Sequence, residues 1–428
     1  MKLNKLAALA VTATMAAAPV MAELVIPDLS YRTGPYAAGG TPFSDGYQDY
    51  FNLLNARDGG IGGEAIRILE CETGYNTEKG VECYEATKGE GALIYQPLST
   101  GITYQIIPKA MADGIPIHTM GYGRTSAADG SVFPWVFNYP ANYWDAASVM
   151  VNYLLDENDG SLEGKTLALL YHNSAYGKEP IRTLESLAEM HGFELTQMAV
   201  DHPGQEQKSQ WLQIRRERPD YVLMWGWGVM NQVAVQEAAN IGFPMENFIG
   251  NWWAGAEHDV MPAGDAANGY KSLNMNRVSK DLPVLAEIKS SVHDAGNAAG
   301  DGSNLGSVLY IRGMYAAMLA SEAIAKAQEI HGVPAVTSVM VRDGMEALEI
   351  TNARMDELGM PGVGPGFSVS CADHGGSGLG IVQQWDASAG VWVALTDFIA
   401  PDDSVTTPLI TEDAAAFAAE NNITPGCN

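Results

Sequence analysis

The segment NARDGGIGGEAIRIL, residues 55–69, decides how the first part of this chain folds. Its glycine-rich centre separates a helix predicted near residues 44–55 from the β-branched run at residues 66–69, which predicts a strand. Another short run of this kind, at residues 24–26, precedes the helix. Strand, helix and strand in this order are typical of a βαβ unit, whose two strands lie parallel in one sheet.

The alternation of strands and helices continues through most of the chain. Further strands are predicted at residues 93–95, 115–118, 166–171, 194–200, 221–225 and 248–249. Amphipathic helices are predicted at residues 78–88, 103–112, 147–155, 181–188, 207–216 and 232–241. Two parallel sheets, each with helices on both faces, account for these elements better than one oversized sheet. The predicted fold is therefore α/β, with two doubly wound parallel-sheet lobes.

Breaks in this alternation indicate where the chain passes between the lobes. Residues 137–143 contain Pro140 and interrupt the pattern, and further crossovers are predicted near Leu273 and Gly378. A long helix at about 305–329, another at 336–348 and strands around 368–371, 381–385 and 391–395 complete both lobes. We predict a first lobe of residues 23–138 plus about 275–377, and a second of residues 139–274 plus about 378–428.

The N-terminus has the features of a signal peptide, residues 1–22. Lys2 and Lys5 form a basic start, residues 6–20 are apolar but too short to span a bilayer, and residues 20–22 (Val-Met-Ala) form a small-residue cleavage site. No cysteine follows that site to carry a lipid, and no later apolar run approaches the about 20 residues of a membrane helix. We therefore expect an exported, periplasmic and soluble protein that begins at Glu23.

Four cysteines in an exported chain favour two disulfides. Cys71, Cys83, Cys371 and Cys427 allow three connectivities. Proximity along the chain favours Cys71–Cys83, which leaves Cys371–Cys427, while free buried thiols are the alternative.

Composition and charge exclude several classes of protein. Of 428 residues, 46% are apolar and 18% are charged, which is typical of a packed globular protein and not of a disordered one. The net charge of −27 becomes −29 when the two lysines of the leader are removed. Such a surface repels phosphate backbones and anionic headgroups, so we expect no nucleic-acid partner and no stable membrane insertion.

Two glycine-rich stretches fail as nucleotide-binding motifs. Residues 164–166 (Gly-Lys-Thr) look like the end of a phosphate-binding loop, but Gly160 is one residue too close and the stretch precedes a strand instead of following one. Residues 361–366 lack the glycine spacing of a dinucleotide fingerprint and contain two prolines. We therefore expect no cofactor.

Residues near Cys371 also fail to form a complete reactive site. Cys371, Asp373 and His374 have no second Cys/His pair to complete a tetrahedral metal site, and Cys371 is expected in a disulfide. Ser377 lacks the glycine two residues later that a nucleophile elbow needs. We predict neither a metal nor an enzyme, with a hydrolase that uses His374 and Ser377 as the remote alternative.

Several motifs of the first 250 residues occur together in one known family. They are RTGPY at residues 32–36, the segment at residues 55–68, a Ser-Thr turn at residues 98–101, LLYHNSAYG at residues 169–177, and Gly250 after a strand. In this combination the chain resembles type I periplasmic binding proteins of the leucine/isoleucine/valine-binding family. The resemblance covers about residues 24–395 and is strongest before residue 250.

This resemblance implies a function as well as a fold. The chain would be the solute-capturing subunit of an ABC importer, with three hinge crossovers and the small-molecule solute in the cleft between the lobes. Its partners would be a permease and an ATPase, and we expect a monomer. A sensory protein that passes the same closure to a receptor is the alternative within this class.

The expected site lies beyond the carboxyl ends of the strands, where loops lead into helices. Ser99 and Thr100 follow the strand predicted at residues 93–95 and lead into the helix after Gly101. Two hydroxyls and free backbone N–H groups could therefore hold a carboxylate there. An ordinary helix N-cap also favours these residue types.

The resemblance adds three further positions. Gly121, Tyr122 and Gly123 match the family's second carboxylate-binding loop, where Gly123 replaces the usual hydroxyl and leaves only backbone N–H groups. Tyr176 matches a residue that closes over the ligand, although Tyr-Gly at a strand end is otherwise a turn. We expect Tyr310 either to add a hydroxyl to the site or to pack in the core.

The opposing wall is rich in tryptophan. Trp225 and Trp227 follow one strand, and Trp252 and Trp253 follow the next. We expect Trp227 and Trp252 to face the cleft, and Trp225 and Trp253 to turn into the core. Amino-acid binders of the family carry an acid just after the Gly250 position, where this chain has Trp252. The sequence thus favours a small carboxylate with an aromatic or apolar body, with a branched-chain amino acid as the alternative.

Overall fold

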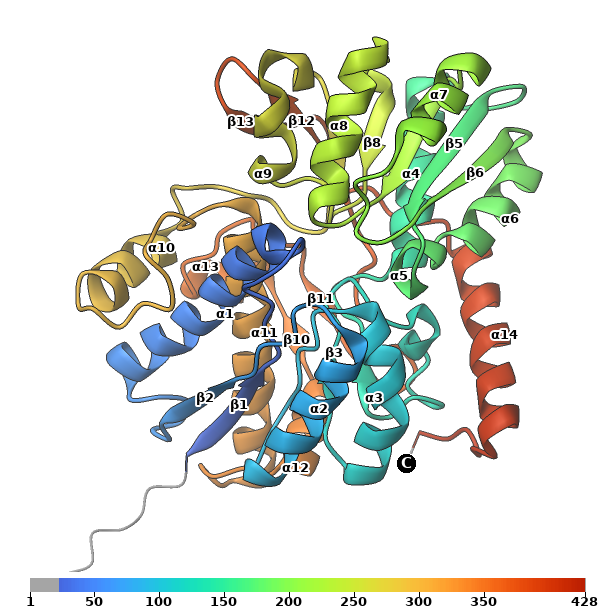
Figure 1. Cartoon of the computed structure of the whole chain (residues 1–428). Coiled ribbons are helices and arrows are strands. Elements are labelled where there is room, and N and C mark those ends of the chain that lie inside the picture. Colours follow the sequence, from blue (N-terminus) through green and yellow to red (C-terminus); the bar gives the residue numbers. More distant parts are fainter. Residues whose placement is uncertain (1–22, 428) are drawn as a thin grey trace, which may run out of the picture.

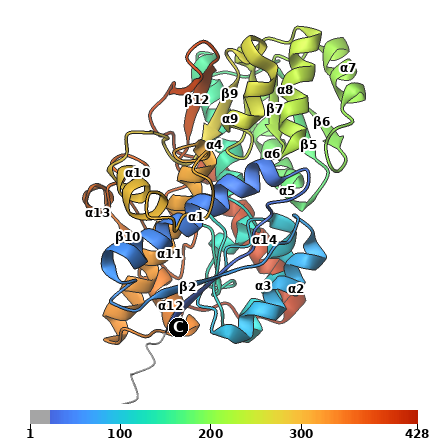
Figure 2. The same ribbon diagram turned by 60° about the vertical axis from the view of Figure 1, so that its left-hand side comes forward.

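The computed structural model describes residues 23–427, so the predicted signal peptide lies outside the described residues. Two lobes lie one above the other (Figures 1 and 2). We refer to the lobe built on β1 to β4 as the first lobe and to the lobe built on the seven-stranded sheet as the second lobe. The fold is the predicted one, α/β with largely parallel sheets.

The sheet of the first lobe consists of short parallel pairs. β1 (Leu24–Asp28) pairs with β2 (Ile66–Glu70), and β3 (Ile117–His118) pairs with β4 (Val136–Phe137). Isolated bridges from Val25 to Ala92 and from Tyr95 to Ile117 join these pairs. The segment predicted as a strand at residues 93–95 therefore lies in the sheet, but it forms single bridges instead of a ladder.

Helices and two short strands complete the first lobe. They are α1 (Ala37–Asp58), α2 (Thr77–Thr87), α3 (Thr100–Asp113), α10 (Pro283–Ile288), α11 (Val308–His331), α12 (Ser338–Glu346), α13 (Asn352–Glu357), β10 (Glu349–Ile350) and β11 (Phe367–Ser368). α11 is long and apolar enough to cross a membrane, contrary to our expectation for the later part of the chain, but most of it is buried against α1 and α12.

The second lobe contains one sheet of order β13-β12-β9-β8-β7-β5-β6. Its strands are β5 (Thr166–His172), β6 (Glu194–Val200), β7 (Tyr221–Trp225), β8 (Phe248–Gly250), β9 (Lys271–Asn274), β12 (Ile381–Asp386) and β13 (Val391–Ala394). Its helices are α4 (Tyr143–Glu157), α5 (Ala175–Lys178), α6 (Ile181–His191), α7 (Lys208–Glu217), α8 (Val229–Ile241) and α9 (Glu257–Val260). β12 runs antiparallel to β9, whereas β5 to β9 are parallel.

Both faces of this sheet are buried, as a doubly wound sheet requires. Leu167 and Leu169 of β5 belong to the hydrophobic cluster of α4 and α6, while Ala168 and Leu170 belong to the cluster of α7 and α8. Successive side chains of a strand point to opposite faces. A continuous apolar run therefore supplies two cores at once.

The chain crosses between the lobes in three places around one side of the cleft. The first crossover follows β4 and contains a cis peptide bond between Tyr139 and Pro140. The second begins at Met275, because Leu273, predicted at the crossover, lies inside β9. The third leads from residue 375 to β12.

The C-terminal helix α14 (Asp403–Asn421) contacts both lobes (Figure 1). It packs against α4 and α6 of the second lobe and against the 3-10 turn Thr125–Ala128 of the first. Two consecutive carboxylates pair with arginines of different lobes: Glu412 with Arg182, and Asp413 with Arg124. The predicted lobe boundaries, which assign residues 378–428 and therefore α14 to the second lobe, stay a proposal.

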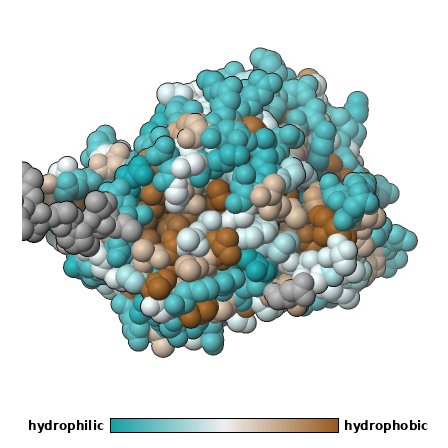
Figure 3. All heavy atoms as spheres, turned by 90° about the horizontal axis from the view of Figure 1, so that it is seen from below, coloured by the Kyte–Doolittle hydropathy of each residue, from teal (hydrophilic) through white to brown (hydrophobic). Residues whose placement is uncertain are grey.

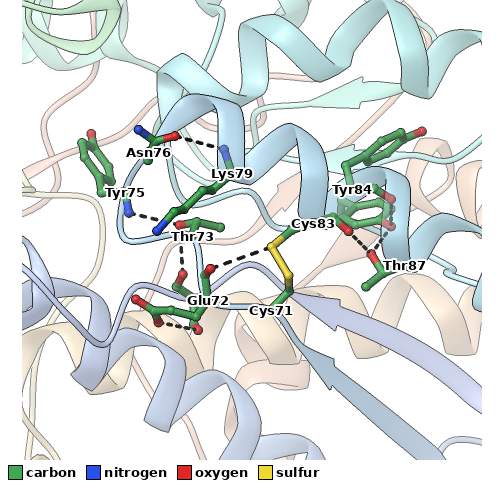
Figure 4. Close-up of a disulfide and its surroundings, with 11 residues drawn as sticks. Cys71, Glu72, Thr73, Tyr75, Asn76, Lys79, Cys83, Tyr84 and Thr87 are labelled. Atoms are coloured by element: carbon green, nitrogen blue, oxygen red, sulfur yellow. Dashed lines mark hydrogen bonds between the residues drawn. A yellow bond between two sulfur atoms is a disulfide. The ribbon is translucent and has the colours of Figure 1, made fainter.

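Both predicted disulfides are present. Cys71–Cys83 joins the end of β2 to α2, with Cα atoms 5.7 Å apart (Figure 4). Cys371–Cys427, with Cα atoms 5.5 Å apart, fixes the segment after α14 to the first lobe. No free cysteine remains among the described residues.

Exposed apolar side chains occur on the face that carries α12. Seen from below, this face shows hydrophobic residues among hydrophilic ones (Figure 3). Ile330 at the end of α11, Val333 after it and Val339 in α12 are among the exposed large hydrophobic side chains of the described residues.

Candidate functional site

A cavity lies between the lobes, at the carboxyl ends of their strands. The space inside it that the centre of a water-sized molecule can reach is about 20 Å³. The first lobe contributes Tyr31, Tyr75, Leu98, Ser99, Thr100 and Tyr122, and the second contributes Tyr143, Tyr176, Trp227 and Trp253. Sites for drug-sized ligands enclose about 300–1,000 Å³. The cavity is far smaller than that in this form of the protein, which favours a small solute.

The polar groups at the start of α3 are hydrogen-bond donors. Ser99 is the N-cap and its Oγ accepts a hydrogen bond from the Ile102 N–H at 3.3 Å, while Thr100 Oγ1 accepts one from the Gly123 N–H at 3.2 Å. The two hydroxyls also interact with the phenols of Tyr75 and Tyr143, respectively. Within residues 23–427, the N–H groups of Thr100 and Gly101 have no acceptor. Together with the helix dipole they favour an anion.

The five tyrosines of the cavity divide into two groups. The hydroxyls of Tyr31 and Tyr176 donate to the carbonyls of Leu98 and Gly226, and that of Tyr122 accepts from the Leu98 N–H. Those of Tyr75 and Tyr143 interact with the side chains of Ser99 and Thr100, respectively. Tyr75 lies on the loop after Cys71 (Figure 4). Burial raises the pKa of both phenols, so they stay neutral donors.

Trp227 and Trp253 form the aromatic wall. Their rings meet edge to face with centroids 5.4 Å apart, and Trp227 also meets Tyr31 at 6.2 Å. The Trp227 Nε1 is buried and has no hydrogen-bond partner among the described residues. A donor without a partner, beside a cavity, is available to an acceptor on a solute.

Trp252 does not line the cavity, contrary to prediction. Its ring stacks on Tyr143 with centroids 6.0 Å apart, and its Nε1 donates to the Gly121 carbonyl at 2.7 Å. The Trp253 Nε1 donates to the same carbonyl at 3.1 Å. Of the two rings, that of Trp253 lines the cavity. The expectation that Trp225 is buried is confirmed.

The loop of Gly121, Tyr122 and Gly123 supports the cavity instead of offering its backbone donors. Gly121 and Gly123 have φ angles of 69° and 83°, which favour glycine. The N–H groups of Tyr122 and Gly123 already donate to the Thr119 carbonyl and to Thr100. Only the side chain of Tyr122 lines the cavity, so the predicted backbone contacts to a carboxylate are not available.

Tyr310 lies in the core and not at the cavity. Its hydroxyl donates to Asp49 at 2.7 Å, and the side chain is 1% exposed. Of the two roles expected for it, the structure shows core packing.

Five cavity residues were missed by sequence reasoning: Tyr31, Tyr75, Leu98, Tyr143 and Trp253. Position gives a signal for two of them, since Tyr31 follows the first strand and Leu98 precedes the Ser-Thr turn. Tyr75 lies on a loop closed by a disulfide, and Tyr143 follows the first crossover. Hydrophobic periodicity gives no information at either place.

The residues considered for catalysis are engaged elsewhere. His374 is fully buried, stacks on Phe137 at 3.9 Å and contacts the Val136 carbonyl through Nδ1 at 2.7 Å. The Ser377 hydroxyl donates to the Pro140 carbonyl at 3.3 Å. Among the described residues no hydrogen bond joins Ser377 and His374. Cys371 is in a disulfide, so it is not available as a metal ligand.

Polar contacts across the cleft hold the lobes closed. The Tyr36 hydroxyl of the first lobe lies 2.9 Å from His172 Nε2 and 2.7 Å from His202 Nδ1 of the second. On the other side, Tyr104 and Thr125 donate to the buried carboxyl of Glu179. Burial lowers the pKa of His172 to about 3 and raises that of Glu179 to about 7.

Known proteins share this architecture. A family profile described as "Periplasmic binding protein" matches residues 23–390. A solved structure described as an ABC transporter permease from the Pseudomonas fluorescens group is 41% identical, with a TM-score of 0.87, and the match covers 95% of this chain and 100% of that one.

Two further structures share the fold at lower identity. A branched-chain amino acid ABC transporter protein from Thermus thermophilus with bound valine is 18% identical, with a TM-score of 0.75 and coverage of 91% and 99%. A solute-binding protein of an ABC transporter from R. palustris, in complex with benzoate, is 18% identical, with a TM-score of 0.69 and coverage of 90% and 99%. No curated protein matched the chain.

Proposed function

Because this chain belongs to the periplasmic binding protein family, we propose that it captures a small carboxylate with an aromatic or apolar body for an ABC importer. The protein acts in the periplasm as a monomer, after removal of residues 1–22. A permease and an ATPase take over the captured solute.

The observation that carries this proposal is the absence of an acidic side chain among the ten residues that line the cavity. The ammonium group of an amino acid would be buried there without an anionic partner, which costs several kcal/mol. Cation–π contact returns only about 2 kcal/mol even when water is excluded.

The acids nearest in sequence to the tryptophan pair are already engaged. Glu257 accepts the Val308 N–H through both carboxylate oxygens at 3.2 Å, and so caps α11. Asp259 is fully buried and accepts from Asn231 Nδ2 at 3.1 Å and from the Ala256 N–H at 2.9 Å. Neither carboxylate is free to receive an ammonium group.

The polar groups of the cavity favour a carboxylate. Ser99, Thr100, Tyr75, Tyr143 and the Trp227 Nε1 are all donors, and charge-assisted hydrogen bonds to a buried carboxylate contribute about 1.5–3 kcal/mol each. The rings of Tyr31, Trp227 and Trp253 favour a flat or apolar body, with about 0.5–1.5 kcal/mol per aromatic pair beyond burial.

Capture works through closure of the two lobes. Since the cavity takes residues from both, a solute binds the closed form better than the open one and shifts the population toward it. The permease then recognises the closed form. A sensory protein would use the same closure, and a neighbouring permease and ATPase gene pair would favour transport.

A ligand screen tests the proposal. Purified mature protein is scanned by thermal unfolding against benzoate, phenylacetate, short aliphatic acids, leucine, valine and glycine betaine, and each hit is titrated calorimetrically. A ligand at about 100 times its Kd stabilises the protein by roughly 2.7 kcal/mol. We expect the aromatic acids to bind more tightly than leucine or valine. Micromolar binding of leucine or of the betaine, with no aromatic acid bound, would overturn the proposal.

A further inference from the structure

Arg312 of α11 is a buried cation without an ion-pair partner. Its side chain is fully buried, and within the described residues no carboxylate lies within 4 Å of it. Burial lowers its pKa to about 9, so it still carries its charge at neutral pH. A buried charge that lacks a counter-charge is destabilising, and such a group calls for an explanation.

The hydrogen bonds of Arg312 are to neutral acceptors. Its two terminal nitrogens donate to the Trp252 carbonyl and to Asn274 Oδ1, and Nε lies 3.4 Å from Asn276 Oδ1. Arg312 comes from the first lobe, whereas Trp252 and Asn274 belong to the second. These contacts therefore form when the lobes close, and they satisfy the donors without neutralising the charge.

One indole ring separates Arg312 from the cavity. The guanidinium carbon lies 4.9 Å from the centroid of the Trp253 ring, and Trp253 lines the cavity. Glu257 and Asp259 act on Arg312 through their charges alone, because both are hydrogen-bonded to other groups and form no ion pair with it. A charge at this depth is screened little by water or salt.

We infer that Arg312 is the residue that selects negative charge in the solute, across the Trp253 ring and without touching the solute itself. A carboxylate in the cavity would add its negative charge to those of Glu257 and Asp259, while a neutral molecule of the same shape would add none. This inference rests on the proposed function, which it deepens by assigning the preference for anions to a named residue. The donors at the start of α3 also favour an anion, but they bind an amide as well, because an amide carbonyl accepts hydrogen bonds.

The test compares one acid with its neutral isostere. Benzoate and benzamide are titrated calorimetrically into the mature wild type, Arg312→Lys and Arg312→Met. Lysine keeps the charge and loses the planar fork, whereas methionine removes the charge and keeps an apolar side chain of similar length. Replacement of a buried ion by a hydrophobic residue is often neutral for stability, so we expect the methionine variant to fold.

We expect the ratio of benzoate to benzamide affinity to fall by about tenfold in Arg312→Met and to change by less than about threefold in Arg312→Lys. A residue with a structural role alone would weaken both probes together and leave the ratio constant. If methionine prevents folding, Arg312→Gln gives the same readout. Arg215→Met, at an exposed position of α7, is the matched control and should leave the ratio unchanged.

The outcomes separate the inference from the function on which it rests. A wild type that prefers benzoate, with the same ratio in the methionine or glutamine variant, overturns the role of Arg312 and leaves the function standing. A wild type that binds no aromatic or aliphatic acid overturns both.

Discussion

Gly39 of α1 and Trp227 of the second lobe fit so closely that a β-carbon on residue 39 would lie 2.4 Å from Cη2 of the indole. Real β-carbons do not approach a ring to this distance, so one of the two would have to move. Trp227 reaches Gly39 only when the lobes are closed. The absence of a side chain at residue 39 is therefore a requirement of closure and not of the fold of either lobe.

We predict that Gly39→Ala weakens solute binding by tenfold or more and leaves the fold intact. Overpacking of this kind costs about 1–3 kcal/mol in the closed form. Within a helix, alanine is more favourable than glycine by roughly 0.5–1 kcal/mol. Thermal unfolding without solute should thus occur at the same temperature or higher, while calorimetric titration shows the loss of affinity.

Gly89→Ala is the control for this prediction. Gly89 also lies in helical backbone, but a β-carbon there meets nothing within 4 Å. Its affinity should equal that of the wild type. Equal affinities for all three proteins would show that the contact with Trp227 adapts without cost.

The Cys71–Cys83 disulfide holds the loop that presents Tyr75 (Figure 4). Thr73 fixes the same loop, because its hydroxyl donates to the Ser30 carbonyl at 2.9 Å and accepts the Tyr75 N–H at 3.1 Å. Tyr75 has a φ of 59°, which is uncommon for a residue other than glycine. We predict that replacing both cysteines by serine weakens solute binding as well as stability, because Tyr75 loses its position.

The second disulfide provides the comparison. Cys371–Cys427 closes a span of 56 residues against 12 for Cys71–Cys83, so in the chain-entropy model it contributes roughly 4 kcal/mol against roughly 3. Its removal should lower the unfolding temperature at least as much, with the smaller effect on affinity. Denaturant unfolding and titration of both double variants measure this. The opposite order of affinities would contradict a special role of the Tyr75 loop.

Much of the fold was predictable because the second lobe has long apolar strands. β7 was predicted with the bounds it has, since it is a continuous apolar run that is buried on both faces. β6 was also predicted with its bounds, although it is a partly exposed edge strand. β9 was missed because Lys271–Asn274 is short and three of its four residues are polar. α14 was missed because threonines and Pro408 in its first half have low helix propensity, and contacts with both lobes stabilise it.

The site was predictable where it depends on helix starts and not where it depends on ring orientation. Ser99 and Thr100 follow from the geometry of parallel sheets, which puts helix N-termini at the carboxyl edge. Trp252 and Trp253 are adjacent and both donate to the Gly121 carbonyl, but Trp252 stacks on Tyr143 while Trp253 packs against Trp227 at the cavity. That carbonyl is 131 residues away from Trp252, so no local pattern contains this information.

We predict that alanine at both Ser99 and Thr100 weakens benzoate binding by at least tenfold, because two hydroxyl donors to a carboxylate are lost. Ser99 is also an N-cap, so stability should fall by about 1 kcal/mol. Thr337→Ala removes the N-cap of α12, away from the cavity, and should reproduce the loss of stability alone. Titration and thermal unfolding of both variants separate the two effects. Unchanged affinity in the double variant would place the carboxylate elsewhere in the cavity.

Glu179 couples closure to the uptake of a proton. Its carboxyl accepts hydrogen bonds from Tyr104 and Thr125 across the cleft, and burial raises its pKa to about 7, with the charge of Arg124 opposing the shift. In an open form the carboxyl would return toward its ordinary pKa of 4.5. Because the pKa is raised by closure, the contribution of Glu179 to binding is fully present below about pH 4.5 and is lost as the pH rises through about 7.

His172 and His202 act in the opposite direction. Their pKa values are lowered by burial, so closure expels protons from them and is disfavoured as the pH falls below 6.5.

The wild-type profile therefore contains both effects, and the comparison with Glu179→Gln isolates one of them, because both proteins carry the histidines. We predict that the Kd of the wild type for benzoate, divided by that of Glu179→Gln, rises between pH 5 and pH 7 by at most about tenfold per pH unit, the limit for one proton. Titrations in buffers of different ionisation enthalpy should show proton uptake in the wild type that is reduced in the variant. Parallel profiles with equal proton uptake would mean that Glu179 keeps its protonation state when the lobes close.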